Sequence, residues 1–105
     1  MNAGALVSIH FNSTGSRTGS GIESYIHSYN SCYGSKTLQS HAHAGLVGAL
    51  GLYDRGMKQA ELAVCGGKCP GVLLEIAFID NQGDMDAYQS RKDAVAAGIA
   101  AGVAQ

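Results

Sequence analysis

The strongest constraint on the fold is the apolar run Gly71–Ile79, which carries a single charged residue, Glu75. A run of this kind is typical of a central β-strand that is covered on both faces, so the chain is expected to build a sheet around it. A carboxylate inside such a strand is costly unless it is paired, hydrogen-bonded or protonated. Two interpretations of Glu75 stay open: it makes a local hydrogen bond at a strand end, or it is placed there for chemistry.

Two more segments have strand patterns. Leu6–Phe11 is a short apolar run that stops at a loop rich in Ser, Thr and Gly, and it delivers His10 to that loop. Gly21–His27 alternates apolar and polar side chains, which predicts one buried and one wetter face. The residues on the wetter face are Glu23, Tyr25 and His27.

Helical spacing appears in two places, Lys36–Leu50 and Arg91–Val103. Asp84 is predicted to cap a short helix that runs through Tyr88, and Tyr53–Lys58 is predicted to be a polar turn. Together these segments predict an α/β fold in which a small, mainly parallel twisted sheet is flanked by helices. We expect residues 1–105 to form a single domain.

Composition excludes several classes of function. Seven Lys and Arg against eight Asp and Glu give a net charge of -1, which does not fit binding to nucleic acid or to an anionic membrane. The apolar runs are too short for a membrane span, and no charged segment followed by an apolar one marks a secretory signal. The three cysteines cannot all pair within one chain, and Cys65 and Cys69 are interpreted as ordinary thiols in preference to a metal clip.

Histidine and glutamate together suggest chemistry that neither suggests alone. A lone histidine on a buried strand, such as His10, is more often a core residue satisfied by the backbone. Strands that bring His10 and Glu75 beside a polar loop, however, offer a metal ligand and a carboxylate that can take a proton from water. His41 and His43 lie two residues apart on a predicted helix and point to different faces, so they are predicted to be surface or half-buried residues.

Four ordered blocks carry a family resemblance. They are Val7–Ser13, Ser20–Tyr25, Asp54–Lys58 and Pro70–Asn81. In this order they resemble the zinc-dependent N-acetylmuramoyl-L-alanine amidases, enzymes of bacterial cell-wall turnover and of phage endolysins. The stretch 80–88 is most similar to phage and prophage members. The resemblance implies the C-terminal part of an amidase catalytic domain.

The resemblance also implies roles for four residues. His10 would be a ligand to Zn²⁺, and Glu75 would be the catalytic general base and then general acid. The bond cut would be the amide between N-acetylmuramic acid and the L-alanine of the stem peptide. Asn12 and Arg55 fall in blocks that border the cleft, so they would bind the muramyl peptide. An equally open alternative is that Arg55 pairs with Asp54 or caps a turn, and that Asn12 caps its strand.

The family's other two zinc ligands lie upstream of the block with which this chain begins, so His10 alone is expected to hold zinc weakly. A non-catalytic remnant that only binds peptidoglycan or a partner chain is the alternative hypothesis. The expected partner is peptidoglycan, and an exposed sheet edge would favour pairing of two copies. By analogy with phage members, release through a holin would bring the protein to the wall.

Overall fold

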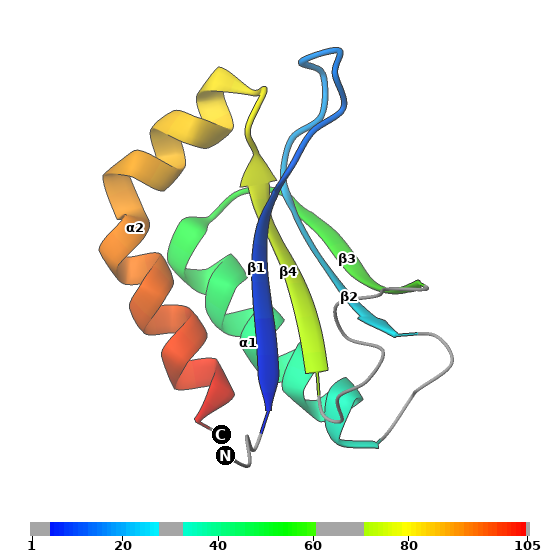
Figure 1. Cartoon of the computed structure of the whole chain (residues 1–105). Coiled ribbons are helices and arrows are strands. Elements are labelled where there is room, and N and C mark those ends of the chain that lie inside the picture. Colours follow the sequence, from blue (N-terminus) through cyan, green and yellow to red (C-terminus); the bar gives the residue numbers. More distant parts are fainter. Residues whose placement is uncertain (1–4, 28–32, 61–70, 105) are drawn as a thin grey trace.

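The computed structural model describes residues 5–27, 33–60 and 71–104 and shows a four-stranded sheet with two helices (Figure 1). The elements are β1 (Leu6–Asn12), β2 (Ile22–His27), α1 (Tyr33–Leu50), β3 (Asp54–Ala60), β4 (Gly71–Phe78) and α2 (Gln82–Val103). The strand order is β1-β4-β2-β3. β1 pairs with β4 and β2 pairs with β3 in parallel, whereas β2 and β4 are antiparallel. The α/β fold is therefore confirmed, and the sheet is mixed: two of its three strand pairings are parallel, as expected, and one is antiparallel.

β3 is the element that the sequence pattern missed. Residues of this strand were expected to form a polar turn, but Asp54–Ala60 pairs with β2 from its first residue to its last, with one bulge at Arg55. β3 is the last strand in the order, so only one of its edges is paired. An edge strand tolerates charged side chains such as Asp54 and Lys58, and its composition then carries little of the apolar signal used to find strands.

α2 joins two segments that the pattern had separated. It runs from Gln82 to Val103 with one non-helical residue, Arg91, at φ −129° and ψ 16°, where the axis kinks. The N-cap is Asn81, whose side chain accepts from the amide of Asp84 at 2.9 Å. The prediction that Asp84 caps this helix is wrong, because Asp84 sits inside the first turn and is buried.

Both helices lie on the same side of the sheet (Figure 1). The apolar core lies between the two layers, and β4 contributes Val72, Leu74 and Ile76 to it. Side chains alternate along a strand, so the residues between these three point to the opposite face. That second face, which no described helix covers, carries Glu75.

The two helices cross at three glycines. A Cβ atom on Gly45 would lie 2.2 Å from the carbonyl oxygen of Gly98, and one on Gly98 would lie 2.5 Å from that of Gly45. A Cβ on Gly102 would lie 2.3 Å from the carbonyl oxygen of His41. The neighbours are backbone atoms, which cannot rotate away, so the close approach of α1 and α2 requires glycine.

Substituting alanine at two glycines of α1 should therefore give effects of opposite sign. Gly45→Ala should lower the free energy of unfolding by about 1–3 kcal/mol, because the helices are forced apart. Gly48 has no atom within 4 Å of the added Cβ, so Gly48→Ala should raise it by up to about 1 kcal/mol through helix propensity. Urea denaturation of the two variants checks this, and equal shifts would contradict the close crossing.

Candidate active site

A row of three ionisable residues crosses the open face of the sheet. His10 of β1 is the register partner of Glu75 of β4, and Glu75 is the register partner of Glu23 of β2. Register partners point to the same face, and neighbouring strands lie roughly 5 Å apart. The fold thus brings together His10 and Glu75, the two residues that the sequence pattern singled out for chemistry.

Glu75 has an unusual environment for a carboxylate. Its Oε2 atom is buried and has no hydrogen-bond partner among the described residues. Burial raises the pKa of Glu75, the neighbouring His10 partly offsets this, and the negative charge of Glu23 adds to the rise. A carboxyl group with one unused oxygen and a raised pKa is better suited to accept and return a proton than an ordinary glutamate.

His10 is exposed beside it, and its Nε2 atom lies 2.8 Å from the hydroxyl oxygen of Ser8. The imidazole is accessible and could turn to a metal ion with little cost, since its one hydrogen-bond partner among the described residues is a surface hydroxyl. A catalytic zinc site usually has three protein ligands. Within the described ranges, no group of three or more His, Cys, Asp and Glu side chains is placed to hold a metal ion. His10 fits as one ligand of such a site and does not complete it.

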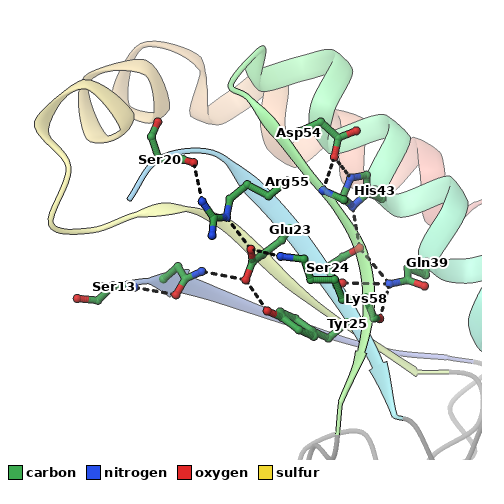
Figure 2. A network of polar contacts seen from close by, with 12 residues as sticks. Ser13, Ser20, Glu23, Ser24, Tyr25, Gln39, His43, Asp54, Arg55 and Lys58 are labelled. Atoms are coloured by element: carbon green, nitrogen blue, oxygen red, sulfur yellow. Dashed lines mark hydrogen bonds and ion pairs between the residues drawn. The ribbon is translucent and has the colours of Figure 1, made fainter. Parts of the chain in front are cut away.

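Glu23 is the centre of a dense polar network (Figure 2). One oxygen accepts from Tyr25 Oη at 2.5 Å and from Asn12 Nδ2 at 3.2 Å, and the other from Arg55 Nε at 2.7 Å and Lys58 Nζ at 2.8 Å. The residue is only 4% exposed. Burial alone would raise its pKa, but hydrogen bonds from Lys58, Tyr25 and Arg55 outweigh burial and lower the pKa to about 2.

The same network acts on Tyr25. Its hydrogen bond to Glu23, together with burial, raises the pKa of the Tyr25 phenol to about 12. The phenol therefore keeps its proton and acts as a donor. Glu23 stays ionised and its four lone-pair positions are filled, so it is not available as a metal ligand or as a base.

An irregularity in β3 aims Arg55 at this network. Ile22 pairs with Asp54 but the next residue, Glu23, pairs with Gly56, which leaves Arg55 as an extra residue. Gly56 has φ 101°, a backbone conformation that favours glycine. Such bulges redirect a side chain, and here Arg55 reaches across to Glu23 of the neighbouring strand.

Asn12 and Arg55, the two residues expected to bind substrate, thus meet at one carboxylate. Arg55 pairs with Glu23 and not with Asp54. Sequence patterns placed Glu23 on the wetter face of an alternating strand, from which it could approach His10, and Lys58 in a polar turn, and predicted substrate binding for neither. Glu23 shares a register row with His10 and Glu75, but this row follows from the pairing of β2 with β4, for which the sequence has no signal.

A second polar network lies on the helix side of β2. His43 of α1 binds the hydroxyl of Ser24 through Nδ1 at 2.7 Å and the carboxylate of Asp54 through Nε2 at 2.7 Å. The Asp54 pKa is lowered, first by the hydrogen bond from His43. His43 is 4% exposed, which corrects the expectation of a surface or half-buried histidine. Ser24 is fully buried, so this serine, histidine and aspartate hold α1 to the sheet and do not form a nucleophilic triad.

The segment that follows β4 holds the loop between β1 and β2 through three of its side chains. The Asp80 carboxylate accepts from the amide of Gly15 at 2.8 Å, and Asn81 donates to the carbonyl of Gly19 at 2.9 Å. Asp84 accepts from the Ser20 hydroxyl at 2.5 Å. The loop that leads from Asn12 to Glu23 is therefore fixed to the start of α2. Cys65 and Cys69 lie outside the described residues.

Comparisons of the sequence with known proteins agree with one another. The family described as N-acetylmuramoyl-L-alanine amidase, Amidase_3, matches residues 1–105. N-acetylmuramoyl-L-alanine amidase LytC of Bacillus subtilis (strain 168) is 37% identical over 83 residues, which make up 78% of this chain and 17% of LytC. The similarity thus covers most of this chain and a small part of that relative.

Solved structures show the same fold. The catalytic domain of CwlV, the N-acetylmuramoyl-L-alanine amidase from Bacillus (Paenibacillus) polymyxa var. colistinus, matches with a TM-score of 0.84 and 33% identity over 96% of this chain and 56% of that one. An N-acetylmuramoyl-L-alanine amidase from Clostridium difficile 630 matches with a TM-score of 0.86 and 29% identity, over 97% of this chain and 56% of that one. The chain spans about half the length of these structures.

Proposed function

Because this chain belongs to the N-acetylmuramoyl-L-alanine amidase family, we propose that it is part of a peptidoglycan hydrolase that cuts the amide between N-acetylmuramic acid and L-alanine of the stem peptide. The observation that carries the proposal is the buried, unpartnered oxygen of Glu75 in register with the exposed His10 on an open sheet face. A proton acceptor beside an available imidazole is what amide hydrolysis by an activated water requires.

Each residue has a distinct role in this proposal. Glu75 takes a proton from the attacking water and returns it to the leaving amine of L-alanine. His10 would hold Zn²⁺, which supplies Lewis acidity when bound, together with ligands from outside the described residues. Asn12 and Arg55 bind the muramyl peptide at the edge of the row. Glu75 needs its raised pKa for the second half of this cycle, because a strongly acidic carboxyl would not carry the proton to the amine.

The test is digestion of purified cell walls by the full chain, with and without added Zn²⁺. Cleavage at the proposed bond releases soluble peptides with new N-terminal alanine and creates no new sugar reducing ends. New reducing ends without new amino groups would contradict the assignment. Zinc uptake is measured in parallel by equilibrium dialysis, and a His10→Ala variant should bind less metal.

A second candidate is a catalytically incomplete chain that binds peptidoglycan or a partner chain. It is favoured by the lack of a three-ligand group within residues 5–27, 33–60 and 71–104. Sedimentation with insoluble walls, without release of amino groups at any zinc concentration, would support this function. β1 is an edge strand within the described residues, so pairing of two copies through it is part of the same proposal.

The route to the wall is also a proposal. From the resemblance of residues 80–88 to phage members, we propose an endolysin-like protein that is released through a holin. No helix in the described part of the chain is long and apolar enough to cross a membrane.

A further inference from the structure

The network around Glu23 carries more positive charge than its structural role needs. One buried carboxylate is paired with two cations, Arg55 and Lys58. The cluster as a whole therefore has one surplus positive charge. The side chains of Arg55 and Lys58 are 34% and 39% exposed, so solvent or a ligand can reach both.

Arg55 is fixed on three sides. Its Nε atom donates to Glu23, its Nη1 atom lies 3.5 Å from the carbonyl oxygen of Ser20, and its guanidinium carbon lies 4.9 Å from the ring centroid of Phe78. Its Nη2 atom makes no hydrogen bond within the described residues. Lys58 donates one of its three N–H groups to Glu23. Both cations are thus held in place and keep donors unused.

We infer that Arg55 and Lys58 bind a free carboxylate of the stem peptide and thereby favour acidic over amidated peptides. This inference rests on the proposed function, which places the scissile amide at Glu75. Glu23 lies one strand, or roughly 5 Å, from Glu75, and the two cations lie around it. Two extended residues span at most about 7 Å, so a carboxylate on the residue after L-alanine is within reach of this pair.

Charge and geometry favour a carboxylate as the ligand. A guanidinium with an open N–H edge and an ammonium beside it make short, charge-assisted hydrogen bonds to a planar anion. The amide of the same group would offer one neutral oxygen and would present an NH₂ to two cations. A preference for the acid of about tenfold is expected, since each charge-assisted bond is roughly twice as strong as a neutral one.

The inference is tested by NMR titration of the full chain with two probes. N-acetylmuramoyl-L-alanyl-D-glutamate and N-acetylmuramoyl-L-alanyl-D-isoglutamine, each with its γ-carboxyl group blocked as the methylamide, differ only in whether the α-carboxyl group is free or amidated. The acid should bind about tenfold more tightly at low salt. Arg55→Gln and Lys58→Gln should each remove most of this preference, and Lys58→Arg should retain it.

Lys92→Gln is the matched control, because Lys92 is an exposed lysine on α2. It removes the same charge and should leave the preference unchanged. Equal affinity for both probes, or a preference that survives Arg55→Gln and Lys58→Gln, overturns the inference and leaves the proposed function standing. If the chain binds neither probe and no purified wall, both the inference and the proposed function fail.

Discussion

Replacing Glu75 with glutamine should reduce wall cleavage by roughly 10²–10⁴-fold, the usual contribution of a positioned general base. Glutamine keeps the shape of the side chain but cannot take a proton from water. Release of amino groups from purified walls measures the loss. Cleavage at more than about a tenth of the unchanged rate would mean that another group carries the proton.

The stability of the fold should not fall with activity in Glu75→Gln. Glu75 has a buried oxygen without a partner among the described residues, and burial raises its pKa above the ordinary value of 4.5. The ionised form of Glu75 therefore lowers the free energy of unfolding once the pH rises above 4.5. Glu75→Gln removes the charge, so the free energy of unfolding at pH 7 should stay unchanged or rise by about 1 kcal/mol.

Glu23→Gln is the matched control for this stability effect. The pKa of Glu23 is lowered to about 2, so its charge stabilises the fold above pH 4.5, and this contribution is lost as the pH falls toward 2. The same substitution at Glu23 should therefore cost about 3 kcal/mol at pH 7, because two cations lose a buried partner. Equal effects of the two substitutions would contradict the assigned environments.

The sequence predicted those parts of the fold whose signal is local. Gly71–Phe78 was found because a buried strand has an apolar run that no exposed segment shows. α1 was found through its helical spacing, although it begins three residues before the expected Lys36. The antiparallel pairing of β2 with β4 could not be predicted, since strand order depends on how distant segments pack.

The residues of the candidate site were likewise predictable only where their signal is local. His10 and Glu75 stood out because a histidine and a carboxylate on apolar strands are anomalies that can be seen in one segment. The environment of Glu23 depends on donors from β1, β2 and β3, including Arg55 at a bulge. His43 is likewise buried because Ser24 and Asp54 approach it from two strands. Such contacts between distant residues leave no periodic trace in the sequence.

Asp84→Ala should be the most destabilising single change among the polar residues of this fold, at roughly 3–5 kcal/mol. Asp84 is 1% exposed and accepts from the amides of Gly21 and Phe78 at 3.0 and 2.9 Å, as well as from Ser20. Alanine would leave buried donors on β4 and on the loop before β2 without an acceptor. A loss of this size is a large part of the 5–15 kcal/mol that typically stabilises a domain.

Urea denaturation measures the loss, and hydrogen exchange shows where it acts. The amides of Gly21 and Phe78 should exchange faster in Asp84→Ala than those of β2 further along the chain. Asp86→Ala is the control, because Asp86 is exposed in the same helical turn and its carboxylate accepts, among the described residues, only from Gln82, so its effect should stay within about 0.5 kcal/mol. Uniform exchange across the sheet would show that Asp84 supports the fold globally. Local exchange would show that it holds the loop which leads to Glu23, the carboxylate with which Arg55 and Lys58 pair.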